Sequence, residues 1–303
     1  MNGSKRAFVE VYGDAESTPE EFLSILQVLR DRGALVDTFT KKRIHRKQLP
    51  ISADDTLLVV GDHDTMTKAF QMLGVPFEKE TSVSGGGVDK LKSKKRILSR
   101  DILPSDCYPP PLQKYMGRSF YETTQTMLLE EVKMKGGLRM FVKPKNEVKK
   151  FTGRVITTLY DVQSLPSDTY LYVCDCVHFM SEFRFFVQSG CVIGIQCYKG
   201  DPCLQSKLNM VIIKKAVDDL ESSPYKTAAY ALDFGLVSHT YKSEDSVTTD
   251  YKDVDSLFDT LLVEWNDAYS LGSYGFSSQH YTDMLIARWQ EVARHVQHIS
   301  QQN

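Results

Sequence analysis

Two side chains with oxygen donors, Glu264 and Asn266, lie two positions apart at the end of the apolar segment LLVEW. Because side chains alternate between the faces of a strand, Leu262, Glu264 and Asn266 are expected to share one face. Val263 and Trp265 are expected on the opposite face. A carboxylate on a core-like strand is costly unless its charge is compensated, and a hard cation with oxygen ligands compensates it. The segment indicates a metal site or, more plainly, a polar strand end that enters a turn.

A further carboxylate, Asp233, stands within the apolar segment AAYALDFGLV. Alternation puts it on one face with Ala229 and Ala231, and puts Tyr230 and Leu232 on the other. The letters DFG also occur in the magnesium-binding signature of protein kinases, but this sequence has no HRDxxxxN loop and no GxGxxG before a lysine strand. A protein kinase is therefore excluded, whereas a magnesium-binding role for Asp233 stays open.

Lysines gather in the segment FVKPKNEVKKFTG, which contains Lys143, Lys145, Lys149 and Lys150. A lysine on a rigid strand supplies a point charge for a phosphate, and a lysine-rich loop can close over the same anion. A solvated basic loop is the plainer interpretation.

An arginine occupies a similar position in the segment SEFRFFV. Alternation puts Glu182, Arg184 and Phe186 on one face, and Phe183 and Phe185 on the other. Arg184 would then face a polar site, where its guanidinium could grip a phosphate or a carboxylate. A structural ion pair between Glu182 and Arg184 would give the same pattern.

The elements that must position these residues fall into two regions. Before residue 80, strands are expected at 7–13, 34–40 and 55–64, and helices at 18–33 and 63–74. Thr18 is expected as the N-cap of the first helix, with Pro19 in its first turn and Gly33 at its end. This order predicts a small open α/β sheet.

The second region is expected to be α+β with largely antiparallel strands. Its expected helices are 119–135, 207–221 and 281–299, and its expected strands are 138–144, 154–160, 169–177, 182–190, 191–200, 227–237 and 261–265. The segment VQSGCV is expected to be a hairpin turn. Between the regions, the Gly- and Lys-rich residues 81–96 could wrap a phosphate, but no GK[ST] follows, and a flexible connector is favoured.

Composition narrows the compartment and the partners. The 303 residues carry a formal net charge of -2 and give a pI near 6.4, which provides no bulk attraction to nucleic acid or an anionic membrane. No apolar run reaches the roughly 20 residues of a membrane span, and the N-terminal residues lack the apolar segment of a signal peptide. We expect a cytosolic protein with no membrane or nucleic-acid partner. Its six cysteines are expected to stay thiols.

Four blocks taken in order carry a resemblance to a known family: FVKP....KKFTG, SEFRFFV...CVIGIQCY, ALDFGL and VEWNDAYSLGSYG. They resemble the ATP-grasp superfamily and, more closely, its clade defined by two arginines and one lysine. The resemblance covers about residues 105 to 280. The ordered set is much more specific than any single block.

This resemblance implies roles by position. Lys149 fills the lysine of the Lys-x-Phe-Thr-Gly block and Arg184 the second arginine, and both would be catalytic. Lys143 stands where the clade usually has its first arginine. The implied nucleotide contacts are Lys143, Lys149, Asp175, Glu182 and Arg184, with the segment YVCDCV as the hinge beside adenine; the implied metal ligands are Asp233, Glu264 and Asn266. In the following loop, Asn266, Asp267 and the glycines could approach phosphate or acceptor.

The resemblance also implies a fold and an activity. The fold would be α+β, with two ATP-grasp lobes that clasp ATP and Mg²⁺ behind a small α/β domain of the pre-ATP-grasp kind. The expected activity is an ADP-forming ligase that turns a small-molecule or peptide carboxylate into an acylphosphate and joins it to an amine or thiol. The alternatives are an ATP-dependent small-molecule kinase and a nucleotide-binding pseudoenzyme that acts as an interaction module.

The expected domain boundaries follow from the same blocks. Residues 1–80 would form the N-terminal domain and residues 81–104 a linker. Residues 105–175 and 176–295 would form the N-lobe and the C-lobe of the ATP-grasp unit, and residues 296–303 a tail.

Overall fold

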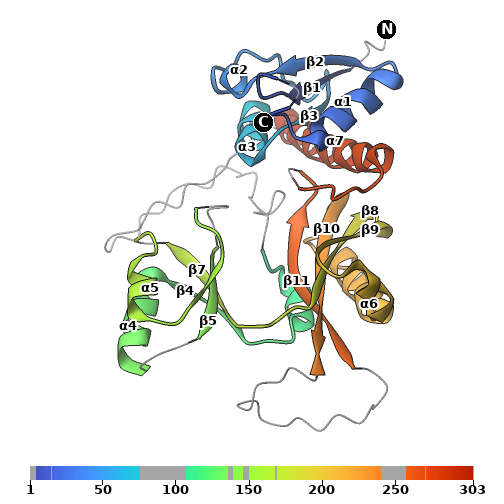
Figure 1. Cartoon of the computed structure of the whole chain (residues 1–303). Coiled ribbons are helices and arrows are strands. Elements are labelled where there is room, and N and C mark those ends of the chain that lie inside the picture. The colour runs from blue at the N-terminus through green and yellow to red at the C-terminus, as the bar shows by residue number, and fades with distance from the viewer. Residues whose placement is uncertain are drawn as a thin grey trace.

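The described part of the chain folds into three sheets with helices packed against them (Figure 1). The computed structural model describes residues 5–14, 16–75, 107–135, 139–145, 150–167, 169–239, 257–269 and 271–302. The first sheet is parallel and the other two are antiparallel. This α+β content agrees with the fold class expected from the sequence. The predicted linker 81–104 lies outside the described residues.

The parallel sheet has the strand order β2-β1-β3. Its strands are β1 (Arg6–Glu10), β2 (Leu35–Phe39) and β3 (Thr56–Val60), and its helices are α1 (Glu20–Asp31), α2 (Lys41–His45) and α3 (His63–Leu73). The predicted strands and longer helices are confirmed, whereas the short helix α2 was not expected. The predicted N-cap is wrong: Pro19 takes that position. The Thr18 hydroxyl instead donates to the Asp14 carbonyl (2.7 Å) and accepts from the Tyr12 N–H (2.9 Å).

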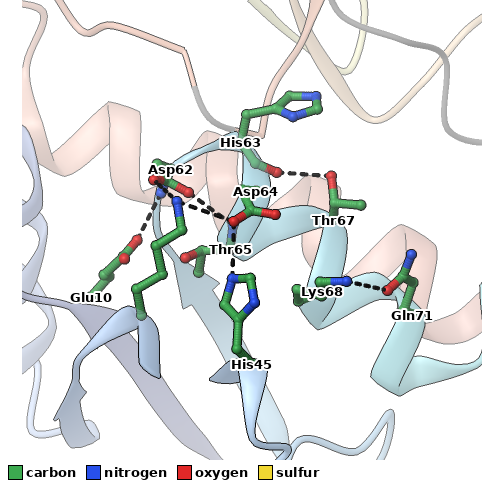
Figure 2. A network of polar contacts seen from close by, with 10 residues as sticks. Glu10, His45, Asp62, His63, Asp64, Thr65, Thr67, Lys68 and Gln71 are labelled. Atoms are coloured by element: carbon green, nitrogen blue, oxygen red, sulfur yellow. Dashed lines mark hydrogen bonds and ion pairs between the residues drawn. The ribbon is translucent and has the colours of Figure 1, made fainter. Parts of the chain in front are cut away.

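A polar network closes the carboxyl end of this sheet (Figure 2). The Asp62 carboxylate caps α3 by accepting from the Thr65 N–H (2.8 Å) and pairs with Lys41 (2.8 Å). The Glu10 carboxylate accepts from the Asp62 N–H (3.0 Å), and burial raises the pKa of Glu10. These contacts tie the end of β1 to the turn after β3 and to the start of α2.

The C-terminal helix α7 (Ser278–Gln302) packs against this first sheet, although the two are far apart in sequence (Figure 1). The Trp289 indole N–H donates to the Thr56 carbonyl (3.2 Å), and its ring stacks on Phe70 with centroids 5.6 Å apart. One hydrophobic core therefore joins the N-terminal unit to the end of the chain. Among the described residues, no helix has the length and apolarity needed to cross a membrane.

The second sheet has the strand order β4-β7-β5-β6. Its strands are β4 (Phe120–Thr124), β5 (Met140–Pro144), β6 (Arg154–Ile156) and β7 (Tyr170–Asp175), and its helices are α4 (Gln125–Lys135) and α5 (Leu159–Gln163). Two expectations are wrong at their ends. The helix expected from 119 begins only at Gln125, because the residues before it pair with β7 as β4. The strand expected at 154–160 ends at Ile156, because Thr158 forms a capping box that starts α5.

The third sheet has the strand order β11-β10-β8-β9. Its strands are β8 (Ser181–Gln188), β9 (Cys191–Gly200), β10 (Ala229–Ser238) and β11 (Phe258–Asp267), and helix α6 (Met210–Glu221) packs on it. Short 3-10 helices precede the second sheet (η2, Pro110–Tyr115) and α6 (η3, Pro202–Lys207). The predicted hairpin is confirmed, with Ser189 and Gly190 at φ 50° and 73° between β8 and β9.

The two faces of the third sheet have different environments. One face packs its apolar side chains with α6 and η2; they include Phe183, Phe185, Tyr230, Leu232 and Trp265. The opposite face carries Phe186, Ala229 and Ala231 into the core shared with α7. Farther along β8 and β10, the same face presents charged side chains instead. Figure 1 shows the second and third sheets facing each other, and these charged side chains form the site described next.

Candidate active site

Arg184 and Asp233 form a buried, two-pronged ion pair between neighbouring strands. They lie directly opposite each other in the β8–β10 register. Arg184 Nε donates to Asp233 Oδ1 (2.8 Å) and Nη2 donates to Oδ2 (2.7 Å), with 6% of Arg184 and none of Asp233 exposed. Burial alone would lower the pKa of Arg184, but the Asp233 charge and hydrogen bonds raise it. The partner of Arg184 is thus Asp233, and the alternative of an ion pair with Glu182 is wrong.

Lys143 and Glu264 form a second ion pair, which spans two sheets. Lys143 lies on β5 of the second sheet and Glu264 on β11 of the third. Lys143 Nζ donates to Glu264 Oε2 (3.1 Å), and the side chains are 7% and 22% exposed. Burial would raise the pKa of Glu264, but the charge and hydrogen bond of Lys143 hold it below its ordinary value. Glu264 is therefore an anion at neutral pH.

Asn266 brings the two carboxylates together. Its amide nitrogen donates to Asp233 Oδ2 and to Glu264 Oε1, each at 3.3 Å. Asp233 and Glu264 also lie opposite each other in the β10–β11 register. The three predicted metal ligands are therefore joined by hydrogen bonds, with the Asn266 nitrogen rather than its carbonyl oxygen directed at the carboxylates, and Asn266 is 4% exposed. Two carboxylates and an amide carbonyl are oxygen donors of the kind that Mg²⁺ prefers.

A bulge in β11 directly precedes Glu264. Asp233 pairs with Glu264 but the next residue of β10 pairs with Leu262, so Val263 is an extra residue in β11. Leu262 consequently packs in the same core as Trp265, and the expectation that Leu262 shares a face with Glu264 is wrong.

Arg118 holds the bulge from outside the sheet. Its guanidinium donates to the carbonyls of Leu262 (2.8 Å) and Val263 (3.1 Å), and also to that of Met116 (3.1 Å). These hydrogen bonds satisfy carbonyls that an irregular ladder displaces. The sequence gives no periodic signal for either the bulge or its clamp.

Tyrosine rings contact both cations of the site. Lys143 Nζ lies 4.3 Å from the centroid of the Tyr108 ring. The Arg184 guanidinium carbon lies 5.6 Å from the Tyr198 ring and 5.1 Å from the Tyr274 ring, and these two rings stack on each other. Sequence reasoning missed all three tyrosines.

Tyr198 could not have been found by counting along the β8–β9 hairpin, because two register shifts interrupt the pairing and Glu182 pairs with Lys199. The structure nevertheless shows Tyr198 Oη donating to Glu182 Oε2 (2.7 Å). Tyr108 and Tyr274 come from separate segments outside any strand, so no spacing relates them to the site.

Other residues expected at the site have different surroundings. Glu182 is 7% exposed and pairs with Lys199 Nζ (2.5 Å). Asp175, at the end of β7, is exposed, and its carboxylate accepts from the Ser119 N–H (2.9 Å). Lys149 lies outside the described residues.

Asp267 does not belong to the site. Its carboxylate is fully buried and accepts two hydrogen bonds from Arg288 of α7, at 2.7 and 2.6 Å. The expectation that Asp267 approaches phosphate or acceptor is therefore wrong. Gly272, in the same loop, does reach the site, because its carbonyl accepts from Arg184 Nη1 (3.3 Å).

The geometry defines a polar centre between two facing sheets, with two cations and two carboxylates in direct contact. Comparison with solved structures shows that this architecture is the ATP-grasp fold. D-alanine–D-alanine ligase from Bacillus anthracis complexed with ATP is 14% identical, with a TM-score of 0.52 over 97% of this chain and 99% of that chain. A D-cycloserine synthetase is 9% identical, with a TM-score of 0.51 over 94% of this chain and 99% of that chain. At these identities the similarity shows the fold alone.

Comparison with family sequences gives a more specific result than comparison of folds. Residues 115–284, more than half of the chain, match family 2 of the ATP-grasp clade defined by two arginines and one lysine. The protein belongs to this family, as the four ordered blocks indicated. None of the curated proteins matches the chain.

Proposed function

We propose that this protein is an ATP- and Mg²⁺-dependent ligase that activates a carboxylate as an acylphosphate and joins it to an amine or a thiol, with release of ADP. One observation carries the proposal: Lys143 and Arg184, from the two facing sheets, meet the acidic pair Asp233 and Glu264 at one centre. In an ATP-grasp fold, this arrangement supplies cations for phosphate and carboxylates for a metal.

Asp233, Glu264 and Asn266 would hold the metal. The hydrogen bonds among them support this assignment, because a cation between the two carboxylates would take the place of the Asn266 N–H donors. The Asn266 amide would then turn its oxygen toward the cation. Bound Mg²⁺ would supply positive charge that stabilises the negative charge developing during phosphoryl transfer. The buried Arg184 pair fixes the orientation of Asp233, so this ligand is set before a metal arrives.

Lys143 and Arg184 would contact the phosphates. Arg184 would stabilise the transferred phosphoryl group with a planar, fixed guanidinium, while Lys143 would supply a point charge from the other sheet. We also propose Lys149 as a catalytic phosphate contact, from the Lys-x-Phe-Thr-Gly block. Asp175 and Glu182 stay proposed nucleotide contacts at the hinge and beside Arg184. For Glu182 the contact would pass through Tyr198, which it already fixes.

The reaction explains why the site needs cations more than a nucleophilic side chain. A carboxylate oxygen of the acyl substrate attacks the γ-phosphorus of ATP, and the bond to the β-γ bridging oxygen breaks to leave ADP. The amine or thiol then attacks the acyl carbon, phosphate leaves, and the nucleophile loses a proton. Small-molecule or peptide carboxylates and amines are the substrates we propose, consistent with ligases of amino acids among proteins of this fold.

The N-terminal unit is proposed to resemble the pre-ATP-grasp domain, with the boundaries expected from the sequence. Its attachment to the core of α7 and to the loop after β11 supports a role in shaping the acyl side of the site. The cytosolic location stays a prediction.

The proposal is tested by trapping the activated acyl group. The full chain is incubated with ATP, Mg²⁺ and pools of carboxylates, with hydroxylamine as the amine probe, and ADP and hydroxamates are measured. A ligase gives both, and Glu264→Gln gives neither, while Asp283→Asn in the exposed Arg32 ion pair behaves as wild type. A stable phosphate ester instead of a hydroxamate would indicate the kinase. Neither product with any pool would indicate the pseudoenzyme and contradict the proposal.

A further inference from the structure

Each cation of the site has two kinds of partner. Lys143 contacts the Glu264 carboxylate at 3.1 Å and the Tyr108 ring at 4.3 Å. Arg184 contacts the Asp233 carboxylate and lies within 6 Å of two rings, those of Tyr198 and Tyr274. All three distances to rings fall in the range in which a cation is attracted to the face of an aromatic ring.

The two kinds of partner differ in what happens to them when ligands bind. If Asp233 and Glu264 bind Mg²⁺, the ion pair that each now makes with its cation must weaken or break. A tyrosine ring is not a ligand for Mg²⁺, so a cation keeps that contact throughout the exchange. The ring also places no negative charge beside the incoming phosphate.

We propose that aromatic rings keep both cations in place while the carboxylates bind the metal. The Tyr108 ring would hold Lys143, and the stacked Tyr198–Tyr274 pair would hold Arg184. This inference rests on the proposed function, since it assigns the exchange to Mg-ATP binding. It makes the three tyrosines positioning residues, which act on phosphate through the cations.

The Tyr108 ring is fixed by its packing. Tyr108 is 4% exposed and packs edge-on against Phe120 and Tyr172, with centroids 5.4 and 5.1 Å apart. Its neighbour Cys107 accepts a backbone hydrogen bond from Trp265 N (3.3 Å), which fastens the segment to the metal-ligand strand β11.

Two contacts hold the rings of Tyr198 and Tyr274 beside Arg184, and Tyr274 is 47% exposed. Glu182 holds the hydroxyl of Tyr198, and the Tyr274 ring stacks on Tyr198 at 5.2 Å. Tyr274 has a φ of 49°, a left-handed conformation that a bulky side chain adopts at a cost. The surrounding loop maintains this conformation, and one function that accounts for it is to keep the ring beside Arg184.

Paired substitutions separate the ring from the hydroxyl. Tyr108→Phe and Tyr274→Phe keep the aromatic face, whereas Tyr108→Leu and Tyr274→Leu remove it. Calorimetric titration with Mg-ATP is expected to show about a tenfold weaker Kd for each leucine variant, and less than about a threefold change for each phenylalanine variant. Tyr160→Leu is the control, because Tyr160 is 76% exposed on α5 and outside the site. Equal Kd values for leucine and phenylalanine variants would overturn the proposal.

A second measurement needs no nucleotide. In a double-mutant cycle, Tyr108→Leu and Lys143→Met are made singly and together, and the midpoints of urea unfolding are compared. If the Tyr108 ring holds Lys143, the shifts in urea midpoint are non-additive. The midpoint of the double variant then falls by less than the sum of the two single shifts. Additive shifts would show that the Tyr108 ring does not hold Lys143 and would contradict this part of the proposal. If the wild type binds no Mg-ATP, the proposed function fails, and this cycle still decides whether the ring holds the cation.

Discussion

Arg184 on β8 and Asp233 on β10 lie opposite each other and are joined by two hydrogen bonds of 2.8 and 2.7 Å. The cation that we assign to phosphate is therefore bound to the carboxylate that we assign to Mg²⁺. Lys143 and Glu264 repeat the relationship across the two sheets. Before ligands bind, the cations and carboxylates of the site neutralise one another. Metal and phosphate are therefore expected to bind together, because Mg²⁺ would draw the carboxylates from the cations and phosphate would draw the cations from the carboxylates.

Removing the Asp233 charge is expected to destabilise the fold. Asp233→Asn keeps the shape of the side chain but leaves the buried Arg184 guanidinium without its counter-charge. Breaking such a pair costs about 3 kcal/mol of unfolding free energy, measured by urea denaturation. The matched control is Asp283→Asn, whose pair with Arg32 is exposed and contributes less than about 1 kcal/mol. Equal losses in the two variants would contradict a buried, charge-dependent pair.

Glu264 is expected to impose a defined pH dependence on stability. Its folded pKa lies below the ordinary value of 4.5, because Lys143 favours the anion despite burial. A depressed carboxyl pKa contributes stability above the unfolded pKa, and this contribution is lost as pH falls through the folded pKa.

The corresponding experiment compares wild type with Glu264→Gln by urea denaturation. The variant is expected to be less stable by about 2 kcal/mol at pH 7, since Lys143 loses a partly exposed counter-charge. The difference should hold from pH 7 to pH 5 and shrink only below about 4.5. A difference that already shrinks between pH 7 and pH 5 would mean that the Glu264 pKa is raised instead.

Arg118 is expected to matter for both stability and metal binding. Arg118→Leu leaves the bulge carbonyls of Leu262 and Val263 without their donor, at a cost of about 1 to 3 kcal/mol in unfolding free energy. Amide hydrogen exchange on β11 should become faster, and the affinity for Mg-ATP should fall because the bulge directly precedes Glu264. Arg154→Leu is the control on an exposed arginine of β6. An unchanged rate of amide exchange on β11 would show that the bulge is stable without the Arg118 hydrogen bonds.

Asp267 is expected to separate stability from binding. Asp267→Asn breaks the buried pair with Arg288 and should lower the unfolding free energy by about 3 kcal/mol. Thermal denaturation measures this loss. At a temperature where the variant is folded, its Kd for Mg-ATP should equal that of the wild type, because the carboxylate faces α7. A large loss of affinity for Mg-ATP in the folded variant would show that Asp267 contributes to the site.

The sequence predicted the parts of the site that lie on regular strands. Alternation along β8 and β10 gave the correct faces for Arg184 and Asp233, because those stretches are regular. The ordered blocks gave the family and the α+β class. Alternation failed at Leu262, where one extra residue in β11 reverses the faces.

Contacts made by loops could not be predicted in this way. Tyr108 and Tyr274 reach the cations from segments with no periodicity, and the role of Asp267 depended on Arg288 of a helix that packs back from the chain end. Position in sequence carries no information on such contacts until the tertiary fold is known. The Thr18 cap failed for a related reason, since a local turn with Asp14 captured its hydroxyl.

We assign Mg²⁺ to Asp233, Glu264 and Asn266, next to phosphates that Lys143 and Arg184 bind. Calorimetric titration of wild type and Glu264→Ala with ATP, in Mg²⁺ and in EDTA, tests this assignment. We expect the wild type to bind ATP at least about tenfold more tightly with Mg²⁺ than in EDTA, and Glu264→Ala to lose this difference. Equal ATP affinity in Mg²⁺ and EDTA, unchanged in Glu264→Ala, would contradict the assignment.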